Sequence, residues 1–317
     1  MSNIAIVCSG GDVSGMNPAL KHFVEYSFEK GLQPYFVDNG YEGLIDNEIY
    51  PVSYRDVSGI INRGGTKIGS ARSKRFKEKE FRAKAYKNLK KHDIKRLIVL
   101  GGDGSFRGLH TFHQEYDIDF CGIPSTIDND INGTEYSLGV DTALNIIKDA
   151  IDALRDTASS FRRAFVIETM GRDCGYLALM SHINSGSELC LIPEIEHNLQ
   201  DYEKQFKKEI QEGRKYFIAI ISEGVKETPQ SVAQWFEETI GIEARVSVLG
   251  HIQRGGNPSS YDRLMAYKFV THAINGLLDG KKESIICYTQ KGFLHKSIDE
   301  VAFKPHHLDK ELLECLL

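Results

Sequence analysis

The sequence predicts an α/β fold built from two doubly wound, mainly parallel Rossmann-like domains. Along its 317 residues, short apolar runs typical of buried strands alternate with longer segments of helical periodicity. Polar, glycine-rich motifs follow several of these runs directly, and open parallel sheets bind ligands at the carboxyl ends of their strands. The number of strand and helix units indicates two sheets, so we expect the functional site in the cleft between the two domains.

The composition excludes several classes of protein. A hydrophobic fraction of 41% and a charged fraction of 26% are ordinary for a globular protein in water, and the net charge of −5 argues against a general nucleic-acid binder. Apolar stretches stay shorter than the roughly 20 residues that span a bilayer, and the chain enters a strand too early to leave room for a signal peptide. We therefore expect a cytoplasmic protein without nucleic-acid or membrane partners.

The six cysteines include no C-x-x-C pair. Four of them lie within or beside apolar runs: Cys8, Cys121, Cys190 and Cys287. We expect buried thiols that act as small hydrophobic side chains in a reducing cytosol.

The first part of the chain contains two strand-and-loop units. Residues 4–7 form an apolar strand that enters a glycine turn at 9–17, and Pro18 suits the first turn of the helix that follows. Such turns are either tight connections or phosphate contacts, so this one is weak evidence by itself. A second strand covers 35–37.

A glycine- and hydroxyl-rich loop over 60–72 ends on Arg72. From there to Arg96 the chain carries twelve Lys or Arg residues against three Asp or Glu. This density is typical of a solvated helix face, although Arg72, at its start, is placed to reach a phosphate.

Two central segments, 97–105 and 121–133, each begin as an apolar run and stop in a loop of Gly, Asp and hydroxyl residues. Glycines let the backbone approach an anion closely, and amides at a helix N-terminus favour negative charge. Carboxylates in such loops would repel bare phosphate, so they imply Mg²⁺ or a proton to be removed. Phosphate-binding amides beside Asp103, Asp128 and Asp130 therefore predict a phosphoryl-transfer site.

The second half continues the alternation. A helix is predicted over 141–155, where apolar residues recur at helical spacing. Apolar strands follow it, most of them ending in polar loops: 165–167, 189–192, 217–221, 246–249 and 284–287. Because ligands bind at the carboxyl ends of parallel strands, we expect the motifs after at least five strands to converge.

Five motifs together resemble a known family. They occur in one order and at matching spacing from Ile4 to about Leu278: Ser9–Asp12, Gly101–Ser105, Pro124–Asp130, Met170–Arg172 and Gly250–Gly256. The chain is thereby similar to the bacterial-type ATP-dependent 6-phosphofructokinases, the phosphofructokinase A family. A nicotinamide dehydrogenase is excluded, because the first strand is not followed by G-x-G-x-x-G.

The resemblance implies an enzyme that uses ATP and Mg²⁺ to phosphorylate D-fructose 6-phosphate at its 1-hydroxyl, the committed step of glycolysis. It implies a nucleotide-binding domain over 1–138, to which 257–304 return. It also implies a sugar-phosphate-binding domain over 139–256, to which 305–317 return. Members of this family usually assemble as homotetramers.

The resemblance assigns the catalytic roles. Asp128 is the general base for the attacking hydroxyl, and a carboxylate within hydrogen-bond reach suits that task. Arg172 stabilises charge on the transferring phosphoryl, Thr126 contacts the same group, and Asp130 supports the loop or the metal. Asp103 holds Mg²⁺. Without the family pattern, Asp128 would close an Asx turn, Asp103 would cap a helix and Arg172 would form a surface ion pair.

The resemblance also assigns binding residues. The expected nucleotide contacts are Gly11, Arg72, Ser73, Gly102, Asp103, Gly104 and Ser105. The expected sugar-phosphate contacts are Thr126, Asp128, Arg163, Met170, Gly171, Arg172, Glu223, Arg245, His251 and Arg254. In the family, Arg163 and Arg245 complete the sugar site of the neighbouring subunit.

Three positions bear on the phosphoryl donor. Pyrophosphate-using relatives carry an aspartate where Gly104 stands and a lysine where Ser125 stands, so Gly104 favours ATP, whereas Ser125 matches neither class. Ser73 replaces a common aromatic residue, which predicts a looser nucleotide fit. The alternatives are a pyrophosphate-dependent phosphofructokinase and a non-catalytic sugar-phosphate-binding paralog, and the paralog would have lost a catalytic aspartate or arginine.

The family's effector pocket, which binds ADP or phosphoenolpyruvate in many bacterial members, is altered. Positive charge persists at Lys21, Arg155 and Arg214. Glu25 and Tyr54 stand where arginines are usual, Glu212 replaces a lysine, and Gly59 replaces an aspartate. Acidic side chains in an anion pocket repel phosphate, so we expect weak or absent control by these ligands.

Overall fold

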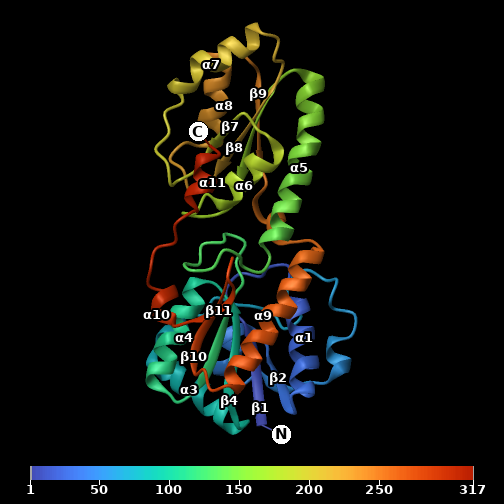
Figure 1. Ribbon diagram of the computed structural model, residues 1–317, viewed down its shortest axis with the longest axis vertical. Helices are drawn as coiled ribbons and strands as arrows, with labels where there is room; N and C mark the ends of the chain where they lie inside the picture. The colour runs from blue at the N-terminus through green and yellow to red at the C-terminus, as the bar shows by residue number, and fades with distance from the viewer. Residues whose placement is uncertain (1, 317) are drawn as a thin grey trace. The chain divides into compact units, whose positions relative to one another are not determined.

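The computed structural model describes residues 2–316, which divide into two compact units (Figure 1). Among the described residues, the first unit covers 2–142 and resumes over Arg254–His306. The second covers Ala143–Gln253 and the residues from His307 onward. The chain therefore builds most of the second unit as an insertion into the first.

The first unit is built on a seven-stranded sheet. Its strands are β1 (Ser2–Cys8), β2 (Leu32–Val37), β3 (Ile49–Pro51), β4 (Ile94–Gly101), β5 (Asp119–Pro124), β10 (Glu283–Thr289) and β11 (Gly292–Lys296). In the order β11-β10-β5-β4-β1-β2-β3, only the edge strands β3 and β11 pair antiparallel. The sequence predicts the five parallel strands and misses these two edges, which are short or only partly buried.

Helices cover both faces of this sheet (Figure 1). They are α1 (Met16–Glu29), α2 (Gly40–Asp46), α3 (Lys79–Lys91), α4 (Asp103–Glu115), α9 (Ser260–Leu278) and the short α10 (Ile298–Val301). On one face, apolar side chains of α2, α3 and α4 join Ala5 and Val7 of β1 in a continuous core. α1 and α9 contact each other and the sheet on the opposite face. This is the doubly wound arrangement that the sequence predicts.

The strand order reverses between β1 and β4. From β1 the chain moves outward to β2 and β3, whereas β4 pairs with the other side of β1 and leads on to β5. The loops at the carboxyl ends of β1 and β4 therefore flank a topological switch point, where doubly wound sheets bind ligands.

The second unit has a four-stranded sheet in which every pairing is parallel. Its strands, in the order β7-β8-β6-β9, are β6 (Ala164–Thr169), β7 (Leu189–Leu191), β8 (Phe217–Ser222) and β9 (Ala244–Val248). The helices are α5 (Val140–Phe161), α6 (Tyr176–Ser185), α7 (Gln200–Gln211), α8 (Pro229–Trp235) and α11 (Lys310–Glu314). Phe206, Phe217 and Phe236 pack their rings together in the core of this unit.

Within residues 2–316, no helix is both long and apolar enough to cross a bilayer. Five cysteines are buried, including the four in apolar runs, and Cys315 is exposed. Burial raises the pKa of the Cys121 thiol to about 12, so this thiol is protonated at neutral pH.

A buried carboxylate in the first turn of α9, Asp262, anchors a turn that follows β5. Its Oδ1 accepts hydrogen bonds from the Tyr136 hydroxyl and the Gly139 N–H. Its Oδ2 accepts from both the N–H and the hydroxyl of Thr142. Burial raises the pKa of Asp262, while these donors oppose that shift. Asp262 thereby fixes the segment through which the chain leaves the first unit.

Replacing Asp262 by alanine removes the acceptor of four buried donors, and each unsatisfied donor costs about 1–3 kcal/mol. We expect Asp262→Ala to lower the free energy of unfolding by about 3 kcal/mol or more, measured by urea denaturation. Asp149→Ala, which removes a carboxylate whose side chain is 73% exposed, should change it by less than about 0.5 kcal/mol. Parent-like stability of Asp262→Ala would contradict the anchoring role.

Candidate active site

The loops after β1, β4 and β5 come together in the first unit. The Ser105 hydroxyl donates a hydrogen bond of 2.9 Å to the Ser9 hydroxyl, which joins the loops after β4 and β1. A Cβ on Gly102 would lie 3.7 Å from the Cβ of Thr126, in the loop after β5. The structure therefore gathers Gly102, Ser105 and Thr126 at the carboxyl ends of the parallel strands.

Asp103 is the first residue of α4, the helix that starts directly after β4. Amides at a helix N-terminus attract anions, and Asp103 adds a carboxylate whose side chain is 38% exposed. Its Oδ2 accepts a hydrogen bond of 2.7 Å from Nε of Arg107, one helical turn later. Asp103 thus combines access for a ligand with an ion pair inside α4.

The carboxylate of Asp103 suits a metal ion that binds together with a phosphate-bearing substrate. Within residues 2–316, no three His, Cys, Asp or Glu side chains are grouped so that they could hold a metal ion by themselves. Mg²⁺ commonly binds through one or two carboxylates and completes its octahedron with substrate phosphates and water. A single accessible carboxylate at an anion-attracting helix terminus suits this second mode.

Gly104, the second residue of α4, faces open space. A Cβ on Gly104 would have no heavy atom within 4 Å, and its φ lies outside the left-handed region. The fold itself therefore does not require glycine at this position. Room for a ligand close to the helix N-terminus is the remaining physical reason for it.

A pocket of about 380 Å³ adjoins Gly104 within the first unit. Tyr41 and Phe76, whose ring centres lie 4.1 Å apart in a stack, line it. A Cβ on Gly108 of α4 would lie 3.5 Å from both rings, so a larger side chain there would fill the pocket. The other lining residues are polar or positively charged: Ser73, Lys77, Arg82, Arg107 and Thr111.

The sequence predicts Ser73 and Gly104 as nucleotide contacts but not the rest of this pocket. One signal was available, since a glycine inside an amphipathic helix such as Gly108 costs about 1 kcal/mol and implies a packing or functional reason. The aromatic pair gave no local signal, because its members lie on segments that only the fold brings together.

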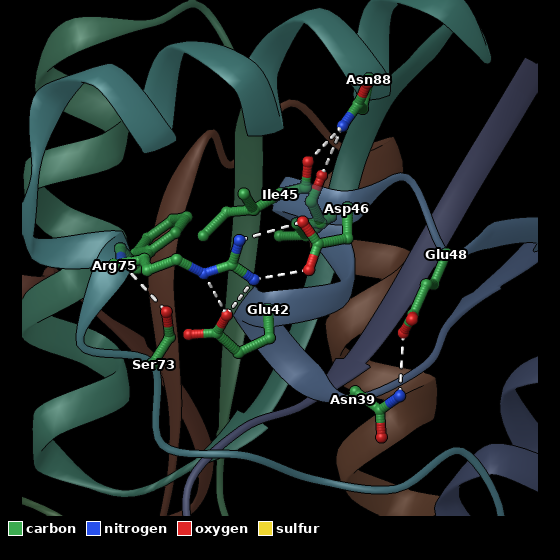
Figure 2. Close-up of polar contacts among 10 residues, drawn as sticks. Asn39, Glu42, Ile45, Asp46, Glu48, Ser73, Arg75 and Asn88 are labelled. Carbon is green, nitrogen blue, oxygen red and sulfur yellow. Dashed lines mark hydrogen bonds and ion pairs between the residues drawn. The ribbon is translucent and has the colours of Figure 1, made fainter.

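Ion pairs hold together the two segments that carry Tyr41 and Phe76 (Figure 2). One ring belongs to α2 and the other to η2 (Arg75–Lys77), a short 3-10 turn. The Arg75 guanidinium contacts the carboxylates of Glu42 and Asp46 on α2, as Figure 2 shows. The stacked rings are therefore positioned without a ligand.

Arg72 and Ser73 follow an isolated β-bridge between Ser9 and Ala71. This bridge draws their segment to the loop after β1. The Ser73 hydroxyl accepts a hydrogen bond of 3.0 Å from the Phe76 N–H and so helps to form η2 (Figure 2). Arg72 and Ser73 thus lie on a segment that is joined to the carboxyl end of β1.

Asp128 is fully buried in the loop after β5. Its N–H donates to the Thr126 hydroxyl at 3.3 Å, and Asn129 has a left-handed φ of 51°. The Asn129 side chain donates to the carbonyl oxygen of Glu135 at 3.1 Å, while Asp130 is half-buried. Polar contacts within the loop therefore hold it in place, and retaining a buried carboxylate in it is costly.

Arg254 lies against Gly11 in the first unit. A Cβ on Gly11 would lie 2.5 Å from Nη1 of Arg254, so glycine makes room for the guanidinium. Nη1 also donates to the carbonyl oxygen of Asp12 at 3.4 Å. The expected sugar-phosphate domain includes this arginine, whereas the structure assigns it to the first unit. The physical reason is local packing, since the Ser14 hydroxyl donates to the carbonyl oxygen of Gly256 at 2.8 Å.

In the second unit, Glu223 anchors the loop that follows β6. Its Oε1 accepts hydrogen bonds from the N–H groups of Gly171 and Arg172, at 3.2 and 2.9 Å. Arg172 is exposed, and its φ of 52° is uncommon for a residue other than glycine. The Met170 N–H donates to the Gln253 side chain at 3.2 Å. The structure thus brings four predicted residues together: Met170, Gly171, Arg172 and Glu223.

Two further residues lie on this part of the second unit. His251 is exposed in η4 (Gly250–Arg254), the turn that follows β9. Glu168, which is not among the predicted site residues, lies in β6, where burial and then the charge of Glu223 raise the pKa of its carboxyl. A charged residue ending an apolar run was the available signal for Glu168, and a shifted pKa is common at functional sites.

Arg163 and Arg245 lie at the opposite end of the second sheet. Arg163 immediately precedes β6, and Arg245 is the second residue of β9. Glu223 and Arg172 instead follow the carboxyl ends of β8 and β6, and a six-residue strand such as β6 spans about 20 Å. Both arginines contact Glu243. Within this unit they are therefore not brought to the loops that hold the other predicted sugar contacts.

The cations of the predicted effector pocket form ion pairs or donate to a backbone carbonyl. Lys21 pairs with Glu25 on α1. Arg214 contacts Glu188 at 2.6 Å, and Arg155 donates to a backbone carbonyl at 2.6 Å. Each of these cations has a partner in its own unit.

The family model described as phosphofructokinase matches residues 3–277. The chain belongs to the phosphofructokinase family. It is 66% identical over 316 residues to the ATP-dependent 6-phosphofructokinase of Sulfurimonas denitrificans, covering 100% of this chain and 99% of the relative. It is 61% identical over 314 residues to the one of a Sulfurovum species, covering 99% and 96%.

Solved structures of the family share the fold. Phosphofructokinase from Saccharomyces cerevisiae superposes with a TM-score of 0.90 at 31% identity over 95% of this chain, which spans only 44% of the yeast chain. A pyrophosphate-dependent phosphofructokinase from Marinobacter aquaeolei has a TM-score of 0.86 at 20% identity, over 98% of this chain and 86% of that one. The fold is therefore shared with an enzyme whose donor is pyrophosphate, so the fold alone does not identify the donor.

Proposed function

We propose that this chain is an ATP-dependent 6-phosphofructokinase, which converts D-fructose 6-phosphate and ATP to fructose 1,6-bisphosphate and ADP in the cytoplasm. One observation carries the proposal. At the carboxyl ends of the parallel strands of the first sheet, Asp103 at a helix N-terminus lies beside the loop that holds the buried Asp128. Relatives 66% and 61% identical over nearly the whole chain carry that name.

Gly104 supports ATP as the donor. The space around it leaves room for the α-phosphate of a nucleotide, which an aspartate would repel. Ser125 carries no charge that would favour pyrophosphate. A non-catalytic paralog is disfavoured because the aspartates and the arginine that the reaction needs are present.

The nucleotide binds to the first unit. Amides at the start of α4 hold phosphate oxygens, and glycines in the loops after β1 and β4 allow their close approach. The base and ribose occupy the pocket lined by Tyr41 and Phe76. Arg72 reaches the transferring phosphate. Asp103 would hold the Mg²⁺, which would offset the negative charge of the nucleotide phosphates.

Asp128 acts as the general base. It accepts the proton of the sugar 1-hydroxyl as that oxygen forms its bond to the γ-phosphorus, while the bond from phosphorus to the β-phosphate oxygen breaks and ADP leaves. Arg172 and the Thr126 hydroxyl donate to the equatorial oxygens on which charge develops. Asp130 supports the loop of the base.

The sugar phosphate is held mainly by residues of the second unit, Met170, Gly171, Glu223 and His251, with Arg254. We propose that Arg163 and Arg245 serve the sugar site of a neighbouring subunit in a homotetramer. Their place at the amino ends of β6 and β9 supports this, because the other contacts follow the carboxyl ends.

Asp128→Asn keeps the shape of the base and removes its proton affinity. We expect kcat to fall by about 10²–10⁴ with little change in the KM of fructose 6-phosphate, in a coupled assay with ATP. Asp130→Asn should cost clearly less. Unchanged kcat in Asp128→Asn would exclude this residue as the base.

Gly104→Asp tests the donor. The side chain fits the space and favours a helix N-terminus, so the fold should persist, as melting temperature will show. Repulsion between the new carboxylate and the phosphates should weaken ATP binding by about tenfold or more. Gly104→Asn, neutral and of the same size, should change it less than about threefold. Equal effects of the two variants would show that size, and not charge, limits binding.

A subunit-exchange experiment tests the shared sugar site. Homo-oligomers of Arg163→Ala should bind fructose 6-phosphate poorly, and those of Asp128→Asn should turn over slowly. Hybrids formed by dissociating and reassembling a mixture regain activity above the sum of the two, because some sites then combine an intact base with the neighbour's intact arginine. A fully active monomer, or no gain in hybrids, would refute the proposal.

A further inference from the structure

Arg107 occupies an unusual place for a cation in the first unit. It lines the pocket beside Gly104, and its Nε donates to Asp103 Oδ2 at 2.7 Å. Its guanidinium carbon lies 5.4 Å from the ring centre of Phe303. The side chain is 54% exposed. Arg107 therefore reaches, from the nucleotide pocket, the one carboxylate that the proposed function assigns to the metal.

The contact between Arg107 and Asp103 is weak enough to exchange. An exposed ion pair four residues apart on a helix changes an equilibrium constant by only about twofold. A divalent cation on the same carboxylate would repel a guanidinium only a few ångströms away. The two cations therefore compete for Asp103.

We propose that Arg107 is a positioning residue that acts as the exchangeable counter-ion of Asp103 and thereby sets how strongly nucleotide binding depends on Mg²⁺. Without metal, Arg107 neutralises Asp103, so that the phosphates of ATP can approach the start of α4. With metal, Asp103 binds Mg²⁺ and Arg107 is displaced. This inference rests on the proposed function, since it requires ATP to bind at this edge of the sheet.

Another cation of the pocket, Arg82, is placed differently. Arg82 is buried, pairs with Glu115 at 2.7 Å and donates to the carbonyl oxygens of Phe76 and Lys77. It is therefore fixed as a structural element. Among the contacts described for residues 2–316, Arg107 is the pocket cation joined to Asp103.

The test measures the dissociation constant of ATP by calorimetry, once in EDTA and once with saturating Mg²⁺. In Arg107→Gln, Asp103 has no counter-ion in the metal-free complex, which weakens ATP binding there. In the metal-loaded complex, Mg²⁺ no longer competes with a guanidinium for Asp103, which strengthens binding. The ratio of the metal-free to the metal-loaded dissociation constant should therefore rise by about two- to fivefold. Arg107→Lys, which keeps the charge, should stay closer to the parent ratio.

Two controls make the outcome decisive. Lys84→Gln breaks a comparable exposed ion pair, with Glu80 on α3, and should leave the ratio unchanged. In an Asp103→Asn background, Arg107→Gln should no longer alter the ratio, because the residue through which it acts is gone. An unchanged ratio in Arg107→Gln, or an equal effect with and without Asp103, would overturn the inference. Failure of the parent itself to bind ATP would instead refute the proposed function.

Discussion

The hydrogen bond between the Ser9 and Ser105 hydroxyls joins the two loops at the switch point of the first sheet. It forms because the loops approach closely, and a Cβ on Gly101 would lie only 2.7 Å from the Cβ of Ser105. This contact sets the position at which α4 begins. The carboxylate of Asp103 and the open space at Gly104 both lie in this first turn of α4.

Local sequence patterns carry most of the fold and part of the site. Buried parallel strands are continuous apolar runs, so their positions and the loops after them can be predicted. Gly102, Ser105 and Thr126 gather because those loops end neighbouring strands. The edge strands β3 and β11 lack this signature, since each has one open side.

The remaining parts of the site depend on contacts between distant segments. Tyr41 and Phe76 stack because Arg75 bonds to α2, which no periodicity indicates. The place of Arg254 follows from packing around Gly256 rather than from its motif. The pairing of Arg107 with Asp103 does have the helical spacing of an ion pair, yet its meaning depends on the pocket beside it.

The insertion of the second unit into the first has a consequence for biosynthesis. β5 pairs with β10, so its partner leaves the ribosome about 160 residues later. During that interval, the apolar residues Phe120 and Ile123 lie on a strand with a bare edge, which is a template for pairing between nascent chains. Arrival of β10 and its hairpin partner β11 closes that edge. That edge therefore stays open while the inserted unit is being translated.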